Sequence, residues 1–315
     1  ITSHLDILMN ILLVSTKTTG GAARACLMQF AALYEQPDFN THLLTLYAHE
    51  SDVDRLDQKQ QSVLTTSTSF LTKVAAKKQA IILHYLSKFH DDGVFLVAGD
   101  KDISNHPEFI RADVIIFHWC YNFVDFGRLP RSGKTFFWTC HDMAPFNGGI
   151  PYQKEDPGWI LARFKRFQKR KLKRQLVGLN IQFIFPSKWL KSEFELSDFG
   201  KLGMQSHHLP NSSEFTQFSL SHNNRLPNSL CFIAADGTNE RKGFDLLLEA
   251  IKQLHEPYEI HIIGKFNERD IDSIEHHRVV AHGYLSDPKE IAKILSQVQA
   301  FVIPSRQDNL PNTVI

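Results

Sequence analysis

The chain has 315 residues, of which 43% are hydrophobic, 22% charged and 11% aromatic, and its formal net charge is +1. This is the composition of an ordinary globular protein of one or two domains, and the small net charge excludes a global polyelectrolyte partner. No apolar run approaches the roughly 20 residues needed to cross a bilayer. Four widely separated cysteines without a CxxC pair argue against a zinc site or a disulfide framework and fit a reducing cytoplasm.

Short apolar runs rich in Ile, Val and Phe alternate with helical stretches along the chain, a pattern typical of parallel strands buried on both faces. In the first part the pattern predicts strands at Asn10–Ser15, His42–Tyr47, Val94–Ala98, Asp113–His118, Thr135–Cys140, Gln182–Phe185 and Gln205–Leu209, and helices at Ala22–Tyr34, Phe70–Phe89, Trp159–Leu176 and Ser187–Leu196. In the second part it predicts strands at Leu230–Ala234, Glu259–Ile263, Arg278–His282 and Ala300–Ile303, and helices at Gly243–Leu254 and Pro288–Gln297.

The alternation of strand and helix predicts an α/β fold with doubly wound parallel sheets. The pattern occurs twice, and the polar stretch 212–228 between the halves has no apolar period, as is typical of a linker. We therefore expect two Rossmann-like domains facing a cleft, at residues 9–218 and 219–315. The second is expected to be incomplete, because the chain ends inside a predicted helix. Since Met9 leads directly into the first strand, residues 1–8 are interpreted as an upstream or non-native segment.

The first candidate motif is the pair Gly20 and Gly21, between the first predicted strand and the first predicted helix. Glycines at such a turn let the backbone approach a ligand, and free N–H groups at a helix start favour an anion. The spacing is not GxGxxG, so a dinucleotide fingerprint is not supported. A tight turn without a ligand would use the same residues, and the motif alone leaves both interpretations open.

The second motif, His141 and Asp142, follows the predicted strand Thr135–Cys140. Open α/β sheets bind ligands at this end of their strands. Histidine can donate a hydrogen bond to a substrate hydroxyl or a phosphate oxygen, and aspartate can orient it. A surface turn with a capping aspartate is the alternative, but the position favours a functional role.

The third motif, Arg241 and Lys242, lies between the strand Leu230–Ala234 and the helix that begins near Gly243. Two cations before a helix N-terminus are opposed by the helix dipole, and a bound anion would offset that penalty. Arginine supplies a planar fork and lysine a mobile point charge, which together suit a diphosphate. A solvated basic loop is the alternative.

The fourth motif follows the strand Ala300–Ile303 and contains Asp308, Asn309 and Leu310. Asp308 and Asn309 offer acceptors and donors for sugar hydroxyls at the start of the next predicted helix. By itself the segment is an ordinary turn.

The fifth feature is the basic segment 164–174, in which Phe164, Phe167 and Leu172 form an apolar stripe among cations. A solvated helix face packed by that stripe is the simplest interpretation. A patch for an anionic membrane surface is the second. Nucleic acid is disfavoured, because no interleaved aromatic platform accompanies the charges.

Taken together, the motifs resemble glycosyltransferase family 4, a GT-B family, and within it the bacterial branch that builds capsule, exopolysaccharide and O-antigen chains. The matching elements are the glycines Gly20 and Gly21, the segment His141 to Gly149, Pro186 to Leu190, Pro210-Asn211, Arg241 to Gly243, and Pro304 to Thr313. Order and spacing agree from Met9 to the last residue. The family's Glu-x7-Glu motif is altered, since Asp308 stands at its first position and the second would follow Ile315.

The resemblance implies transfer of a sugar from a UDP- or GDP-linked donor, with retention of configuration and without a metal or another cofactor. Arg241 and Lys242 would stabilise the departing diphosphate, assisted by the backbone at Gly20 and Gly21. His141 would hydrogen-bond the donor sugar or its phosphate, and Asp308 the sugar hydroxyls.

The implied partners are the nucleotide-sugar donor, a glycan or lipid-linked acceptor and, through the 164–174 helix, an anionic membrane surface; no nucleic acid is expected. The expected location is cytoplasmic, and peripheral association with the inner face of the cell membrane is left open. Two alternatives remain open, namely a non-hydrolysing nucleotide-sugar epimerase of the same fold and a membrane-surface scaffold with a decayed site. The chain as given is expected to be inactive or weakly active, because half of the site would be missing.

Overall fold

The computed structural model describes residues 8–47, 61–63, 70–90, 92–153, 158–211, 225–272, 274–285 and 287–311. The chain divides into two units, Ile1–Ser212 and Ser213–Val314. The predicted boundary between residues 218 and 219 lies outside the described residues, as does nearly all of the predicted upstream segment. In the part of the chain that is described, no helix is long and apolar enough to span a membrane.

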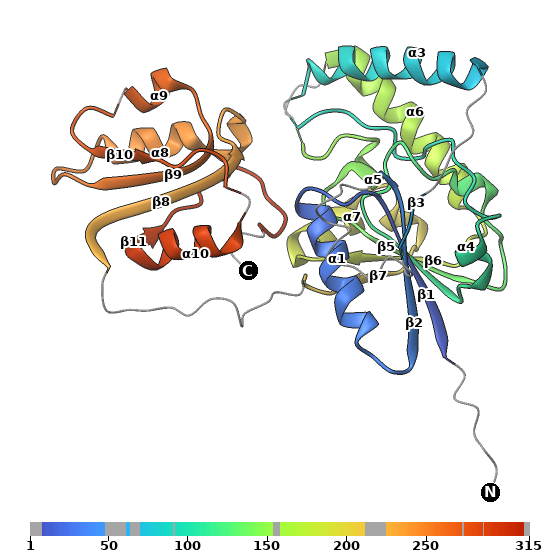
Figure 1. Ribbon diagram of the computed structural model, residues 1–315. Helices are drawn as coiled ribbons and strands as arrows, with labels where there is room; N and C mark the ends of the chain where they lie inside the picture. The colour runs from blue at the N-terminus through green and yellow to red at the C-terminus, as the bar shows by residue number, and fades with distance from the viewer. Residues whose placement is uncertain are drawn as a thin grey trace, which may run out of the picture. The chain divides into compact units, whose positions relative to one another are not determined.

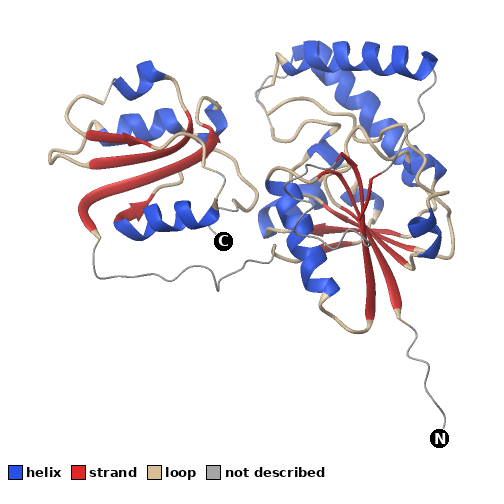
Figure 2. Ribbon diagram, viewed as in Figure 1, coloured by secondary structure: helices blue, strands red, loops and turns tan. Residues whose placement is uncertain are grey.

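A seven-stranded parallel sheet forms the centre of the first unit (Figures 1 and 2). Its spatial order is β3-β2-β1-β4-β5-β6-β7. Its strands are β1 (Met9–Lys17), β2 (Phe39–Tyr47), β3 (Gln61–Val63), β4 (Val114–Phe117), β5 (Thr135–Thr139), β6 (Ile181–Phe185) and β7 (Ser206–His208). The chain winds outward from β1 to β3 and then returns to β4 on the other side of β1, so the winding direction reverses between β1 and β4.

Helices cover both faces of this sheet. They are α1 (Gly21–Tyr34), α3 (Phe70–Ser87), α4 (Pro107–Arg111), α5 (Ala144–Asn147), α6 (Gly158–Leu176) and α7 (Lys188–Leu196). Cys26 and Phe30 of α1 pack on one face against Ile11 and Leu13 of β1. The alternate β1 residues, Leu12 and Val14, belong to the larger core on the other face, to which α4 and α6 contribute Phe109 and Leu172. Apolar residues therefore line both faces of β1, as expected for a buried parallel strand.

The second unit contains a four-stranded parallel sheet of order β10-β9-β8-β11. Its elements are β8 (Leu226–Asp236), α8 (Phe244–Ile251), β9 (Glu259–Lys265), α9 (Glu268–Asp272), β10 (Arg278–Ala281), α10 (Pro288–Gln297) and β11 (Val298–Phe301). Figure 1 shows α8 and α10 on opposite sides of this sheet. Phe244 of α8 packs against Phe232, while Ile294 of α10 packs against Cys231 on the other face. The predicted fold class, α/β with doubly wound parallel sheets, is confirmed.

The predicted strand Val94–Ala98 is wrong. Its residues are buried or half-buried, but they form an irregular segment that hydrogen-bonds to loops rather than to the sheet. The amide of Phe95 donates to the carbonyl of Gly149 at 2.8 Å, and Leu96 exchanges hydrogen bonds with Asn122. A buried loop satisfies its backbone groups in this way, and its apolar pattern alone does not distinguish it from a strand.

Other differences concern short elements and boundaries. Strand β3 and helices α4, α5 and α9 were not predicted; none of them is longer than five residues. The last strand is displaced, since β11 occupies Val298–Phe301 instead of Ala300–Ile303. Residues 226–228 of the predicted linker belong to β8. Tertiary contacts with residues far away in the sequence decide such short elements, so local periodicity does not reveal them.

Candidate functional site

In the first unit, the predicted site residues follow strands on either side of the point where the winding reverses, which is where open α/β sheets bind ligands. Gly20 caps α1 with a φ of 95°, in the left-handed region that favours glycine, and a Cβ there would meet nothing within 4 Å. Gly21 is the first residue of the helix. The hydroxyl of Thr16 donates to the carbonyl of Tyr121 at 3.0 Å, which ties the end of β1 to the loop after β4.

His141 follows β5 and lies against His118, which follows β4. Nε2 of His141 is 3.0 Å from Nδ1 of His118, and the two rings stack with their centroids 5.3 Å apart. Burial lowers the pKa of His141 to about 4 and lowers the pKa of His118 well below its usual range. Both imidazoles are therefore uncharged at neutral pH and act as hydrogen-bonding groups there, not as cations.

Asp142 is buried beside this pair and holds the turn together. Its Oδ1 accepts hydrogen bonds from the hydroxyl of Tyr121 at 2.7 Å and from the amide of Ala144 at 2.8 Å. Burial, together with the nearby carboxylate of Asp142, raises the pKa of Tyr121 well above its usual range, so the phenol stays protonated and donates. The alternative of a surface turn with a capping aspartate is not what the structure shows, because Asp142 is buried and Met143 caps α5. The predicted catalytic role of Asp142 stays a prediction.

The lowered pKa of His141 has a consequence for stability. The folded-state pKa of about 4 lies below the ordinary value of 6.5, so the unfolded chain binds the proton more readily. As the pH falls from 6.5 towards 4, the free energy of unfolding is therefore expected to decrease, by up to about 3 kcal/mol from this residue. Urea unfolding at pH 7, 5 and 4 measures the effect. His141→Gln should reduce the pH dependence, whereas replacing the exposed His208 by glutamine should leave it unchanged.

In the second unit, the third and fourth motifs come together. Nζ of Lys242 is 2.6 Å from Oδ2 of Asp308, and Nη1 of Arg241 is 3.5 Å from the same oxygen. Nη1 of Arg241 also donates to the carbonyl of Gln307 at 2.7 Å. The side chains of Arg241 and Lys242 are 15% and 26% exposed, so solvent screens these interactions only in part. Two cations thus lie beside one carboxylate, and side chains of this kind can bind an anionic ligand.

The loops that carry these three side chains follow β8 and β11, the two strands between which the second sheet reverses its winding. The side chain of Asn239 accepts from the amide of Arg241 at 3.0 Å and caps the short 3-10 turn Glu240–Lys242. The amide of Arg306 donates to the carbonyl of Arg241 at 2.8 Å, and its guanidinium binds the carboxylate of Asp245 in α8. This pairing lowers the pKa of Asp245, so the ion pair between Arg306 and Asp245 stays charged at neutral pH.

The remaining residues of the fourth motif are partly buried beside the cluster. The amide of Asn309 donates to Oδ1 of Asp308 at 3.1 Å, which helps to fix the orientation of that carboxylate. Leu310 is likewise half-buried. Among the described residues, no group of three or more His, Cys, Asp and Glu side chains is placed to hold a metal ion.

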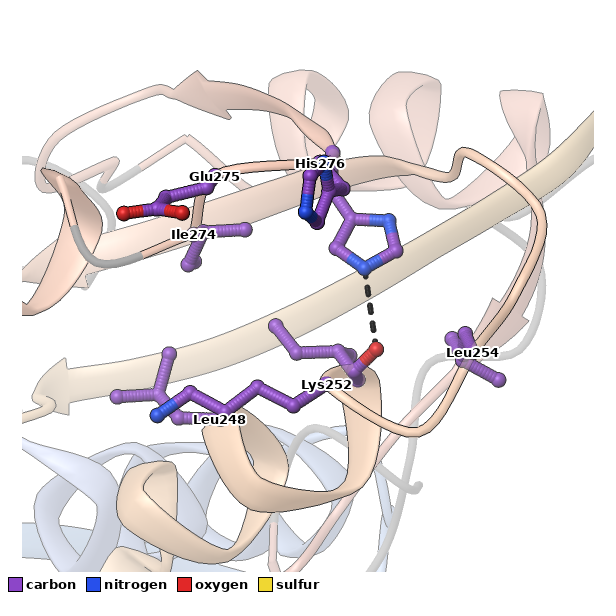
Figure 3. Close-up of a pocket in the computed structure, with 8 residues that line it drawn as sticks. Leu248, Lys252, Leu254, Ile274, Glu275 and His276 are labelled. Atoms are coloured by element: carbon purple, nitrogen blue, oxygen red, sulfur yellow. Dashed lines mark hydrogen bonds between the residues drawn. The ribbon is translucent and has the colours of Figure 1, made fainter.

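A pocket of about 330 Å³ in the second unit lies elsewhere (Figure 3). Leu248 and Lys252 lie on one side of it and Glu275 and His276 on the other. It lies beside the C-terminal end of α8 and the segment that leads into β10, hence at the amino ends of the strands. Ligands of open α/β sheets bind at the opposite, carboxyl ends, so we do not assign this pocket to the site.

Part of the second unit is similar in sequence to a known family. Residues 227–315 match the family model described as Glycosyl transferases group 1. A relative in Escherichia coli strain K12, named as the colanic acid biosynthesis glycosyl transferase WcaC, is 24% identical over 202 residues, which make up 58% of this chain. The chain spans about half of that relative, since the match covers 49% of its length.

Solved structures share the fold. The lipopolysaccharide outer core galactosyltransferase WaaB, in its apo form, has a TM-score of 0.58 and 13% identity, over 97% of this chain and 77% of that one. Anabaena HepE, solved in complex with UDP and glucose, has a TM-score of 0.56 and 12% identity over the same shares of the two chains. At such low identity the likeness concerns the fold, which is that of GT-B glycosyltransferases.

Sequence reasoning did not identify His118 or the pair of Arg306 and Asp245. His118 ends a predicted strand, where a polar residue is a signal for a site, but an imidazole can also end a strand without a function. Arg306 and Asp245 are 61 residues apart in the sequence, and local patterns do not report contacts across that separation.

Proposed function

We propose that this protein transfers a glycosyl group from a nucleoside diphosphate sugar to a glycan or lipid-linked acceptor in polysaccharide synthesis. The observation that carries the proposal is the cluster of Arg241, Lys242 and Asp308 at the carboxyl ends of β8 and β11, within the segment that matches the group 1 glycosyl transferases. The fold shared with HepE, whose structure contains UDP and glucose, supports a uridine nucleotide as one donor to test.

The chemistry follows from charge. When the bond between the anomeric carbon and the diphosphate oxygen breaks, the electron pair goes to the diphosphate and negative charge develops there. Arg241 and Lys242 stabilise this charge as preorganised donors, so the transfer needs neither a metal nor another cofactor. His141 hydrogen-bonds the donor sugar or its phosphate, and Asp308 the sugar hydroxyls. The acceptor hydroxyl attacks the face that the diphosphate leaves and passes its proton to a diphosphate oxygen on that face, so the configuration is retained.

The test is incubation of the purified full-length protein with a panel of UDP- and GDP-linked sugars, with and without EDTA. Release of nucleoside diphosphate, slow without acceptor and faster with lipid-linked glycan, is the expected result. Formation of an epimeric nucleotide sugar would instead identify an epimerase of the same fold. The proposal is wrong if the folded protein neither binds nor turns over any of these donors. NMR analysis of the first product formed decides between retention and inversion.

We further propose that α6 rests on an anionic membrane surface at the inner face of the cell membrane. Arg163, Arg166 and Arg170 recur at helical spacing on its exposed side, together with Trp159 and Phe167, which are 78% and 63% exposed. Arginines beside exposed aromatic rings are typical of helices that lie in a membrane interface.

Helix α3 lies beside α6 (Figure 1). Leu83 and Leu86 of α3 pack in one cluster with Leu161 of α6, and Ile81 and Tyr85 of α3 are exposed. Two partly buried lysines of α6, Lys169 and Lys173, form ion pairs with Asp198 instead of facing solvent. The exposed arginines are therefore the ones available to lipid headgroups.

Replacing Arg163, Arg166 and Arg170 together by glutamine is expected to weaken binding to phosphatidylglycerol vesicles about a hundredfold, since each basic residue near an anionic surface contributes about 1 kcal/mol. Vesicle co-sedimentation measures this effect. A matched variant with Arg111, Arg128 and Arg278 replaced by glutamine should bind as the original protein does. Equal binding by both variants, or binding that 0.5 M salt does not weaken, would contradict the proposal.

A further inference from the structure

His118 is held rigidly beside His141. Its side chain is 2% exposed, its amide donates to the carbonyl of Val14 at 2.9 Å, and its carbonyl accepts from the indole of Trp138 at 3.2 Å. The backbone of His118 is thus fixed to both neighbouring strands, β1 and β5. The imidazole can therefore present Nδ1 to Nε2 of His141 with little conformational freedom.

One N–H group lies between the two rings, and a neutral pair can supply it through either of two combinations of tautomers. In the first, His118 donates through Nδ1–H, and His141 carries its own proton on Nδ1. In the second, His141 donates through Nε2–H, and His118 carries its proton on Nε2. Which nitrogen of a histidine is protonated is set by the hydrogen bond that the other nitrogen makes.

The surroundings of His118 distinguish the two arrangements. Its Nε2 is buried, and no residue that the structure describes forms a hydrogen bond with it. The second arrangement would place an N–H group at that nitrogen, and unpaired buried N–H groups are rare because they lose their hydrogen bond to water. The first arrangement leaves only a lone pair there. Burial lowers the pKa of both rings, so both are neutral at pH 7 and each carries a single N–H proton.

We propose that His118 is a positioning residue, which donates its Nδ1–H to His141 and so keeps the proton of His141 on Nδ1. His141 then acts as a hydrogen-bond donor to a donor-substrate oxygen through Nδ1–H. This inference rests on the proposed function for its catalytic consequence, whereas the tautomer itself does not depend on any activity.

The direct test is NMR of the imidazole nitrogens in protein labelled with 15N-histidine, at pH 7 and without substrate. The expected result is a protonated Nδ1 and an unprotonated Nε2 for His141, with the resonance assigned by its loss in His141→Gln. A protonated Nε2 in His141 would overturn the inference. If the tautomer is as expected and no nucleotide sugar is turned over, the proposed function fails and the assignment of the pair stands.

The kinetic test compares three substitutions of similar size. His118→Asn retains an N–H donor and is expected to keep kcat within a few fold of the original value. His118→Leu has no hydrogen-bonding atom, and His118→Asp offers only an acceptor and imposes the other tautomer; both are expected to lower kcat about tenfold or more with little change in KM. Equal rates for all three variants, with thermal unfolding confirming that each is folded, would show that His118 only fills space.

Discussion

Replacing Lys242 by alanine is expected to slow glycosyl transfer by about a hundredfold or more while the protein stays folded. The loss of one preorganised donor to a developing negative charge typically raises the barrier by about 2.7–4 kcal/mol. Lys242 is 26% exposed and contacts the carboxylate of Asp308, which Arg241 also approaches. Removing the lysine therefore leaves Asp308 with a charged partner, so a large loss of stability is not expected.

The measurement is initial-rate kinetics with the donor that the panel identifies, together with circular dichroism and thermal unfolding. Lys252→Ala is the matched control, because Lys252 follows the opposite end of the same helix, α8, at the amino ends of the strands. That variant should retain the original rate. Near-normal turnover by Lys242→Ala would remove the diphosphate assignment of the cluster. A rise in KM alone would mean that the lysine binds the donor equally well before and during bond breaking.

The variant Asp308→Asn distinguishes two roles of the carboxylate, namely holding the cations and contacting the sugar. If Asp308 chiefly holds the cations, the amide should bind nucleoside diphosphate more tightly than the original protein, since the internal counter-ion is gone. If Asp308 chiefly contacts the sugar hydroxyls, as the resemblance implies, diphosphate affinity should change little and kcat with the sugar donor should fall. Calorimetric titration with nucleoside diphosphate, beside kinetics, distinguishes these results.

The sequence predicted where the second-unit cluster lies better than how it is built. Strand periodicity placed Arg241, Lys242 and Asp308 after two strands of one parallel sheet, and such loops gather at the carboxyl edge of the sheet. The pairing of Lys242 with Asp308 joins residues 66 positions apart. It depends on the register of β8 with β11, in which Leu230 lies beside Ala300. No local pattern specifies that register.

The buried segment Val94–Ala98 shows the opposite limit. Its apolar composition is that of a strand, and the burial implied by the composition is correct. The local pattern does not show that the segment packs on a loop instead of joining the sheet. A Cβ on Gly99 would lie 2.3 Å from the backbone of Phe123, so the two backbone segments are in close contact there. The role of His118 was not predicted for a similar reason, because it depends on a contact with His141, which is 23 residues away in the sequence.

Gly243→Ala is expected to disrupt the cluster of Arg241, Lys242 and Asp308, and so to abolish most of the activity. Gly243 caps α8 with a φ of 72°, which costs a residue with a Cβ about 1–2 kcal/mol. A Cβ there would also lie 2.1 Å from the carbonyl oxygen of Pro304. Because that atom belongs to the backbone of the loop that carries Asp308, the loop must move, and the contact of Asp308 with Lys242 is lost.

Gly283→Ala isolates the steric effect, because Gly283 has a φ of 65° in the same unit but no atom within 4 Å of an added Cβ. Both variants carry the backbone strain, and only Gly243→Ala carries the contact with Pro304. We expect Gly283→Ala to lose about 1–2 kcal/mol of unfolding free energy and to keep its diphosphate affinity. Gly243→Ala should lose more stability and should bind nucleoside diphosphate at least about tenfold more weakly, because preorganisation of the cations is lost. Equal affinities in the two variants would mean that the geometry between the loops after β8 and β11 does not govern anion binding.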